Sequence, residues 1–345
     1  RLLVFMLSNQ IDDTLLKCVS IPGQSGFETP IRTFVTKELA DYGEISHDNL
    51  GSVICKIQGK GEHKLKWFVG AHMDTCGFLV HSIANGLVKC LNFGYQDAKA
   101  CHLQPVAILT EKGYTKGLMH AKQEDKGKPT FEIDLGIRSS LKVEELGIKA
   151  GDPVHFSIDP FLVGNPSERI ICSPRLDNRI GVFELLLLAK NLKNNPPLDD
   201  VFLVATVEEE MGARGAKTAA QKIHPDLALI LDITYDEHPV AMGQGPVITL
   251  SDKSSLLSTY VRDYLLELAK DNKISIQTEV WNIGGTDAGP VRVIGAGIPT
   301  IPVLTATKNN HTPLEMACID DCHSVVNFCQ LIINKSKEIQ AVFQK

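Results

Sequence analysis

An alternation of strand-like and helix-like segments in the second half of the chain constrains the fold more than any other feature. From residue 177 onward, short apolar runs alternate with longer segments whose apolar residues recur at helical spacing. Strands that alternate with helices form sheets covered by helices, so the sequence predicts an α/β sandwich. The expected strands are 201–207, 227–232, 275–281 and 299–305, and the expected helices are 179–192, 214–222, 255–270 and a long one from about 319.

The first 74 residues continue this pattern. One helix is expected over 12–19, and a second begins at Thr29, with Pro30 in its first turn, where its missing N–H costs nothing. A short strand follows at 52–57. The run 67–71 is continuously apolar, which is typical of a strand buried on both faces, and His72 stands at its carboxyl end.

About 100 residues between Asp74 and Asp177 have a different character. Short β-like runs at 86–90, 106–110 and 153–157 are separated by glycine and proline. This pattern indicates an inserted all-β module, which we expect to be a small barrel. The predicted domains are therefore a discontinuous body, 1–74 with 167–345, and an insert, 75–166.

Composition excludes several classes of function. The 345 residues carry a formal net charge of −6 and no basic stripe, which argues against a nucleic-acid partner. No run approaches the roughly 20 apolar residues that span a bilayer, and the apolar opening at 1–7 is read as the lead-in to a first helix rather than a secretory segment. Nine scattered cysteines suggest free thiols in a reducing compartment, so we expect a cytoplasmic protein without a membrane partner.

Polar residues directly after apolar runs are the first candidates for a site, because open α/β sheets bind ligands beyond the carboxyl ends of their strands. Each of these residues alone is more often a helix cap or a structural histidine than a ligand. Their recurrence at nearly every strand end favours a site. The candidates are His72, Asp74, Glu208 to Glu210, Asp232 and His311, together with Asp177 at the start of a helix.

The chemistry of this set points to metal ions. It contains imidazoles and carboxylates and no cysteine, which fits hard or borderline divalent ions in a catalytic site. Two histidines with three carboxylates are too many for one open site, but they suit two ions that share a carboxylate and lie roughly 3.5–4 Å apart.

Two positions near these ligands are expected to assist them. Asp74 follows His72 by two residues, so its carboxylate is expected to accept the proton of the far imidazole nitrogen and to orient the ring. Among Glu208, Glu209 and Glu210, one residue should be a ligand and a neighbour the general base. The alternative for this acidic run is a solvated strand end.

Six motifs in order resemble the tetrahedral-aminopeptidase and glutamyl-aminopeptidase family of co-catalytic dinuclear metallopeptidases, over nearly the whole chain. The insert also resembles that family's barrel domain. The resemblance implies a three-layer α/β/α catalytic domain of the zinc-exopeptidase type with an inserted β-barrel. The motifs are His72-Met-Asp74-Thr-Cys-Gly-Phe, Leu176-Asp177-Asn-Arg179, Val207-Glu-Glu-Glu210-Met-Gly, Leu231-Asp232-Ile-Thr234, Gly284-Gly-Thr-Asp287-Ala-Gly289 and His311-Thr-Pro-Leu-Glu315.

The resemblance also assigns roles to individual residues. Glu209 becomes the general base and Asp177 the bridging ligand. His72 and Asp232 are placed on one ion, and Glu210 and His311 on the other. The implied cofactors are two divalent ions per subunit, with zinc as the first choice and cobalt or manganese as alternatives.

The resemblance further implies dimers that assemble through the insert into a larger particle such as a dodecamer, and peptides as substrates. Asp287 is a candidate for the wall of the substrate pocket, although a glycine turn packed for close backbone approach is an equal alternative. Lys308, Asn309 and Asn310 precede His311 where the family commonly has an aromatic residue, so substrate preference is not carried over.

The predicted function is a metal-dependent aminopeptidase. A dipeptidase or N-acyl amidohydrolase would use the same ligands, but those enzymes usually carry their extra domain after the fourth ligand, whereas this insert lies between Asp74 and Asp177. A non-catalytic binding protein on the same fold would be expected to have lost a ligand or the base, and neither is lost.

Overall fold

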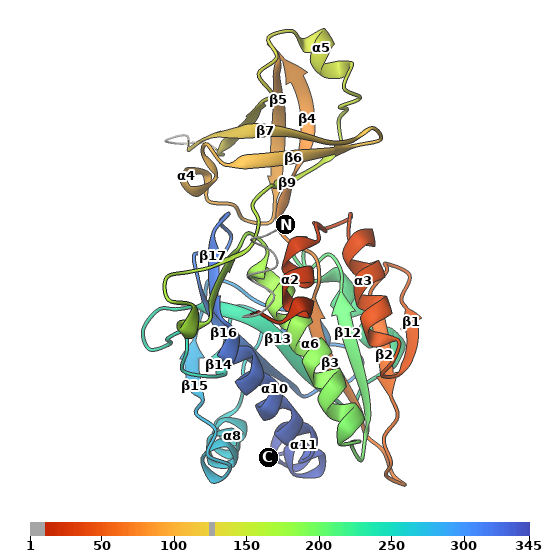
Figure 1. Cartoon of the computed structure of the whole chain (residues 1–345). Helices are drawn as coiled ribbons and strands as arrows, with labels where there is room; N and C mark the ends of the chain where they lie inside the picture. The colour runs from red at the N-terminus through yellow and green to blue at the C-terminus, as the bar shows by residue number, and fades with distance from the viewer. Residues whose placement is uncertain (1–10, 124–127) are drawn as a thin grey trace.

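The structure is a computed structural model that describes residues 11–123 and 128–345. The apolar opening at 1–7 lies outside the described residues. Figure 1 shows a large body of helices and strands with a smaller barrel of strands above it. None of the helices in the described ranges has both the length and the apolar character that crossing a membrane requires.

The body is built on one mixed sheet of 11 strands. The strands follow the order β1-β2-β12-β3-β13-β16-β17-β11-β10, with β14 and β15 extending from β16. The central strands β12, β3, β13 and β16 are parallel, so their carboxyl ends meet at one edge. The bounds are β1 (Glu44–His47), β2 (Val53–Ile57), β3 (Lys66–His72), β10 (Phe161–Leu162), β11 (Ile170–Ser173), β12 (Asp200–Thr206), β13 (Leu227–Tyr235), β14 (Val247–Ser251), β15 (Gln277–Val280), β16 (Thr300–Lys308) and β17 (Glu315–Cys318).

Helices cover both faces of this sheet, which confirms the predicted three-layer fold. Val69 packs into the large core that includes α6, whereas its neighbour Phe68 lies in a separate core with Ala219 of α7 and Val291 of α9. Alternate residues of one strand therefore face different helical layers. The helices are α2 (Asp13–Ser20), α3 (Thr29–Leu39), α6 (Leu176–Asn194), α7 (Arg214–Ile223), α8 (Thr259–Asp271), α9 (Ala288–Arg292), α10 (Ile319–Ile333) and α11 (Ser336–Phe343), with a short 3-10 helix at Pro166–Glu168.

The insert is a closed barrel, as predicted, with strand order β4-β5-β8-β7-β6-β9. Its core contains Phe78, whose ring centroid lies 4.9 Å from that of Phe131 and 5.7 Å from that of Phe156. After the barrel, β10 pairs with β11, so the chain rejoins the large sheet before residue 166. The barrel elements are β4 (Gly77–Ala84), β5 (Leu87–Phe93), β6 (Pro105–Thr110), β7 (Gly113–Lys122), β8 (Thr130–Asp134) and β9 (Pro153–Phe156), with helices α4 (Ala98–Cys101) and α5 (Ser140–Glu144).

Several element boundaries differ from the sequence-based expectation. The helix expected over 255–270 begins at Thr259, because the Ser258 hydroxyl oxygen accepts a hydrogen bond from the Val261 N–H and caps the helix there. The long C-terminal helix is two helices, α10 and α11, that meet near residue 335. Short strands such as β14 and β17 were not expected, since four or five residues give too little periodicity to recognise.

The connection between body and barrel positions the site. β3 ends at His72 and the chain enters the barrel at Gly77, so the carboxyl edge of the parallel strands lies beneath the barrel (Figure 1). Residues at the base of the barrel, Cys76 and Tyr95, therefore reach the candidate residues Glu210 and His311.

Candidate metal centre

The carboxyl ends of β3 and β13 and the first turn of α6 bring three side chains together. Nε2 of His72 lies 3.2 Å from Oδ1 of Asp177 and 3.7 Å from Oδ1 of Asp232. All three side chains are buried, and one donor atom of each lies within 4.8 Å of the others. One imidazole nitrogen with two carboxylate oxygens at this spacing is a suitable set of ligands for a divalent cation.

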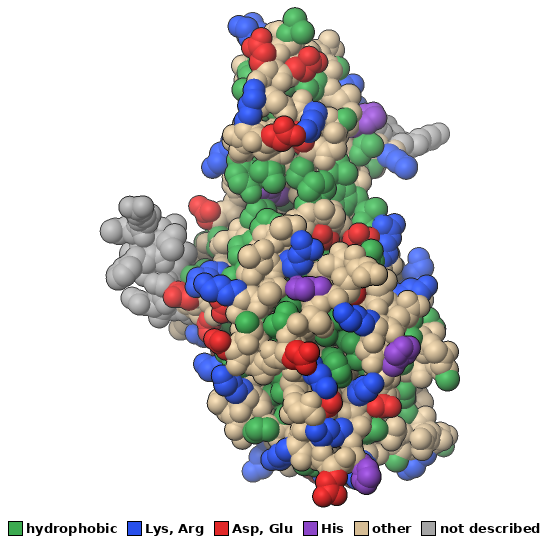
Figure 2. Space-filling model, turned by 90° about the vertical axis from the view of Figure 1, so that its right-hand side faces the viewer, with side chains coloured by type: hydrophobic (Ala, Val, Ile, Leu, Met, Phe, Trp, Pro, Cys, Tyr) green, Lys and Arg blue, Asp and Glu red, His purple; other side chains and the backbone are tan. Residues whose placement is uncertain are grey.

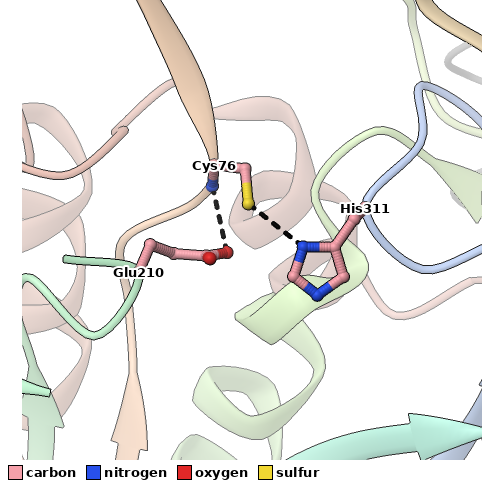
Figure 3. A group of neighbouring side chains, drawn as sticks. All are labelled: Cys76, Glu210 and His311. Atoms are coloured by element: carbon pink, nitrogen blue, oxygen red, sulfur yellow. Dashed lines mark hydrogen bonds between the residues drawn. The ribbon is translucent and has the colours of Figure 1, made fainter. Parts of the chain in front are cut away.

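A second group lies on the other side of Asp177. Figure 3 shows Cys76, Glu210 and His311 pointing toward one another: Sγ of Cys76 is 3.3 Å from Nδ1 of His311, and the Cys76 N–H donates to Oε1 of Glu210 at 3.1 Å. Nε2 of His311 lies 3.3 Å from Oδ2 of Asp177. Asp177 therefore presents one carboxylate oxygen to each group, which is the geometry of a ligand shared by two ions.

Glu209 lies beside the first group, in the turn between β12 and α7. Its Oε2 is 4.0 Å from Nε2 of His72, and its donor atoms belong to neither group. Burial raises the pKa of Glu209 well above the usual value; His72 opposes the shift, and Asp287 adds to it. A carboxylate with a raised pKa next to a set of metal ligands is suited to accept a proton.

Asp74 is fully buried beneath this turn and fixes its backbone. The Asp74 carboxylate accepts hydrogen bonds from the N–H groups of Glu209 at 3.0 Å and Glu210 at 3.2 Å, and from the Ser25 hydroxyl at 2.6 Å. The contact to His72 differs from our expectation: Nδ1 is 3.1 Å from the backbone carbonyl oxygen of Asp74 and 3.6 Å from its carboxylate. The carbonyl is therefore the nearer acceptor for the ring, and the carboxylate accepts its three hydrogen bonds from Ser25 and the Glu209–Glu210 backbone.

Glu315 organises the opposite side of the site. Its Oε2 accepts hydrogen bonds from the N–H groups of Leu176 at 2.7 Å and Asp177 at 3.0 Å, and its Oε1 accepts from the N–H of His311 at 2.9 Å. His311 has a left-handed backbone with φ of 62°, which costs about 1–2 kcal/mol for a residue with a side chain. The bond to Glu315 helps to hold this conformation, and through Glu315 the backbones of Asp177 and His311 are linked.

The charges around both groups favour a bound cation. Burial raises the pKa of Glu210 to about 7, and the neighbouring Asp177 carboxylate contributes. The pKa of Asp232 is raised mainly by burial, with a smaller contribution from Asp177, and His72 opposes the shift. Carboxylates packed together in this way repel one another unless a positive charge lies between them. The donor set therefore fits divalent ions at both groups.

Both groups open onto a cavity of about 690 Å³ at the junction of the sheet edge and the barrel. Gly94 and Tyr95, which follow the barrel strand β5, form part of its wall, and the carbonyl oxygen of Tyr95 lies 3.3 Å from Nδ1 of His311. The cavity extends away from the candidate ligands toward β13, β14 and β15. A cavity of this size is typical of small-molecule binding sites.

Comparison with known proteins shows the family to which this chain belongs. The family model described as M42 glutamyl aminopeptidase matches residues 51–328. The chain belongs to the M42 glutamyl aminopeptidase family. It is therefore a peptide hydrolase, and peptidases of this family are metal-dependent.

Individual relatives agree with the family over almost the whole chain. A protein of Acetivibrio thermocellus, provisionally named an aminopeptidase, is 33% identical over 91% of this chain and 96% of its own length. The TET aminopeptidase of Thaumarchaeota archaeon SCGC AB-539-E09 superposes with a TM-score of 0.88 at 25% identity, covering 96% of this chain and 99% of that one. The Pyrococcus horikoshii TET1 peptidase, which can assemble into a tetrahedron or a large octahedral shell, gives 0.82 at 28% identity over 93% and 98%.

In the structure of this M42 peptidase, six of the eight predicted site residues line the cavity. His72, Asp177, Glu209, Glu210, Asp232 and His311 all line the cavity. Asp74 and Asp287 do not. Asp287, for which a packed glycine turn was the equal alternative, is 1% exposed, and its Oδ2 accepts a hydrogen bond from the Thr206 hydroxyl at 2.5 Å. The residues before it, Gly284 to Thr286, form the wall instead, because Asp287 turns toward β12 at the start of α9.

Sequence reasoning missed two residues of this site. Cys76 was not considered a neighbour of the ligands, although it stands two positions after Asp74. Glu315 was quoted in a motif but received no role. The signal for Glu315 was weak, because an acid four residues after His311 becomes informative only when its carboxylate is seen to join three backbone N–H groups.

Proposed function

We propose that this M42 peptidase is a two-metal aminopeptidase that removes single residues from the amino termini of peptides. The observation that carries the proposal is that Asp177 directs its two carboxylate oxygens at two separate donor groups. His72 and Asp232 complete one ligand set, and Glu210 and His311 complete the other. Zinc is the expected metal, with cobalt or manganese as alternatives, since imidazole and carboxylate ligands accommodate each of them.

The chain's own residues account for proton transfer. When bound, two divalent ions supply Lewis-acid activation of water and of the scissile carbonyl. Glu209 accepts the proton of the attacking water and returns it to the amine that leaves. Asp74 holds the backbone of Glu209 and Glu210, so it acts as a positioning residue. The backbone carbonyls of Asp74 and Tyr95 face Nδ1 of His72 and His311, leaving Nε2 of each ring for a metal.

The proposal is tested with aminoacyl p-nitroanilides and their N-acetylated counterparts. Zinc-loaded protein should hydrolyse the free-amine substrates, and chelator-treated protein should regain activity when metal is restored. Acetylation removes the substrate's positive amine and should abolish turnover. Release of acetate from the acetylated substrates, with the anilide bond left intact, would indicate an N-acyl amidohydrolase instead. Equal release of p-nitroaniline from acetylated and free-amine substrates would contradict the need for a free amino terminus, and the absence of turnover on every substrate would contradict the proposed function.

A closed homo-oligomer is proposed for the assembled enzyme, such as a dodecamer built from dimers through the barrel. The structurally similar P. horikoshii TET1 peptidase assembles into closed shells. Figure 2 shows hydrophobic side chains gathered where barrel and body meet, and a second cavity between the two parts is lined by Phe27, Leu79, Leu91, Phe93 and Met211 among others. Light scattering coupled to size-exclusion chromatography should give a mass many times 37.8 kDa. A monomer at micromolar concentration would contradict this part of the proposal.

A cytoplasmic location is proposed from the free state of the cysteines. All nine cysteines lie within the described ranges and all are free, which fits a reducing compartment and a cytoplasmic enzyme.

A further inference from the structure

The far end of the active-site cavity differs in charge from an ordinary peptide-binding pocket. Beyond the candidate ligands and Glu209, three acids line it: Glu237, Asp252 and Glu279. In the described part of the chain, no lysine or arginine belongs to its wall. Lys308 is nearby in sequence to the wall residue Asn310, but its ammonium pairs with Asp236 at 3.1 Å.

Glu279 is the most buried of these acids. It lies in β15 with 6% of its surface exposed, and its two oxygens accept hydrogen bonds from the hydroxyls of Thr249 at 2.6 Å and Thr234 at 2.8 Å. Both partners are neutral. Among the described residues no cation pairs with Glu279, so a buried carboxylate faces the cavity without a counter-charge. Burial raises the pKa of Glu279, which a cation entering the cavity would reverse.

Asp252 adds a carboxylate oxygen without a hydrogen-bond partner among the described residues. Its Oδ1 accepts hydrogen bonds from the N–H groups of Ser254 at 2.6 Å and Ser255 at 2.5 Å, which fixes the side chain in its turn. Its Oδ2 is buried and has no hydrogen-bond partner among the described residues. A buried carboxylate oxygen without a donor costs free energy, so a donor from a ligand at this place would be favourable.

The remaining wall fits an alkyl stem. Tyr235 and Trp281 stack with ring centroids 5.2 Å apart and an interplanar angle of 23°. Both residues line the cavity, as do Leu304 and Ile283. Aromatic faces attract cations, and the long stems of lysine and arginine pack against apolar surface while their charged ends reach polar groups.

The two ends of the cavity therefore have different charge requirements. At the metal end, two divalent ions would offset the four carboxylates of Asp177, Glu209, Glu210 and Asp232. At the far end, Glu237, Asp252 and Glu279 have no such counter-charge from the described residues of the wall. A positive charge that pairs with these acids would therefore have to come from the substrate.

We propose that this cavity selects peptides whose first residue is lysine or arginine, with Glu279 and Asp252 as the residues that determine the preference. The inference rests on the proposed aminopeptidase function. It departs from the acidic preference that the family's description, glutamyl aminopeptidase, would suggest, because an acidic side chain would meet like charges at this end of the cavity.

The test compares each basic residue with a neutral residue of similar shape. kcat/KM is measured on zinc-loaded enzyme for p-nitroanilides of lysine, norleucine, arginine, citrulline, leucine and glutamate. We expect the wild type to prefer lysine over norleucine and arginine over citrulline by roughly ten-fold or more, as a charge-assisted contact provides. Glutamate should be the poorest substrate.

Two variants separate the proposed role from alternatives. Glu279→Gln and Asp252→Asn should each lower the lysine-to-norleucine ratio by roughly ten-fold. Glu267→Gln removes the same charge from an exposed position on α8 and should keep the wild-type ratio. Thermal denaturation checks that each variant is folded, and two variants at separate positions protect the test against the misfolding of one.

Each outcome decides the matter. A wild type that prefers norleucine, leucine or glutamate would overturn the inference while leaving the aminopeptidase function intact. An unchanged ratio in both folded variants would also overturn it. An equal loss on basic and neutral substrates would overturn it too, by showing that the acids bind the substrate's α-amino group instead. Failure of the wild type to hydrolyse any substrate would remove the proposed function and this inference with it.

Discussion

The body and the barrel bury different kinds of side chain. At the carboxyl edge of its sheet, the body buries His72, Asp74, Asp177 and Asp232 within a few ångströms of one another. The barrel buries an apolar cluster centred on Phe78, and the described residues of that cluster include no acid. Both parts are folded around well-packed interiors, but only one of them concentrates charge.

This difference shows where chemistry is located and what it requires. Buried charges are unfavourable unless they are paired, so the body needs ions, backbone donors and a rigid frame to hold them. The apolar cluster of the barrel contains no charge that needs such partners. The barrel contributes to the site through the segments at its base, where Cys76 contacts His311 and Tyr95 forms part of the cavity wall. Four predictions test whether changes in the body affect catalysis and metal binding, whereas changes in the barrel affect stability alone.

The largest effect is expected from Glu209→Gln in the body. The glutamine side chain cannot accept a proton, so kcat should fall by about 10³-fold while the metal content per subunit, measured by mass spectrometry, stays as in the wild type. The neighbouring Glu208→Gln is the matched control. Glu208 pairs with the half-exposed Arg214 at 3.1 Å, and its loss should change kcat by less than roughly two-fold. Wild-type kcat in metal-loaded Glu209→Gln would exclude Glu209 as the base.

The corresponding change in the barrel should affect stability rather than chemistry. Phe131→Ala removes a 2% exposed ring from the apolar cluster and should cost about 3–5 kcal/mol of unfolding free energy, measured by urea denaturation. Metal content should not change. Phe161→Ala makes the same deletion at a 39% exposed position and should cost much less. If Phe131→Ala lost its metal while still folded, the two parts would be coupled more tightly than their compositions suggest.

A smaller effect is expected at Glu315, whose carboxylate accepts hydrogen bonds from the backbone of the candidate ligands Asp177 and His311. Glu315→Gln replaces one of two carboxylate oxygens with an NH₂ group that cannot accept the bonds from Leu176, Asp177 or His311. Metal affinity, measured by competition with a chromogenic chelator, should fall by about 10–100-fold. Glu338→Gln, at an exposed position on α11, is the control. Unchanged affinity would mean that the backbone holds Asp177 and His311 without Glu315.

The last prediction concerns pH and the barrel's His155. Burial lowers the pKa of His155 to about 4, with a contribution from Arg175, compared with 6.5 for an exposed imidazole. The unfolded chain therefore binds a proton that the folded chain excludes, so this stabilisation is full above pH 6.5 and is lost as the pH falls toward 4. The Tm of the wild type should fall more steeply than that of His155→Gln over this range, and the two curves should be parallel above about pH 7. Equal slopes throughout would contradict the shift.

The sequence predicted the body well because its elements are long and periodic. The runs at 67–71 and 227–232 became β3 and β13, and the positions after or within them held the candidate ligands. It was less informative where structure depends on partners far away. β17 has four residues, and it forms a strand because β11 and β16 pair with it on either side.

The predicted site was similarly divided. Strand ends in a parallel sheet must meet at one edge, so His72, Asp232 and the glutamates after β12 could be grouped from the sequence alone. The assignment of Glu209 and the bridging role of Asp177 came from the family resemblance. The sequence left open whether Asp287 lines the cavity or packs in a glycine turn, because the direction in which a side chain points within a turn depends on its hydrogen-bond partner, here Thr206.

The sequence by itself determined the alternation of the long strands and helices, the position of the insert and the kinds of candidate ligand, because these follow from local periodicity and residue type. The tertiary structure alone decided three features: Cys76 beside His311, Glu315 across three backbone donors, and Glu279 with Asp252 in one cavity. The physical reason is that each brings together segments far apart in the chain. Burial and the absence of a counter-charge depend on the folded surroundings of a residue, so they cannot be inferred from the residue type.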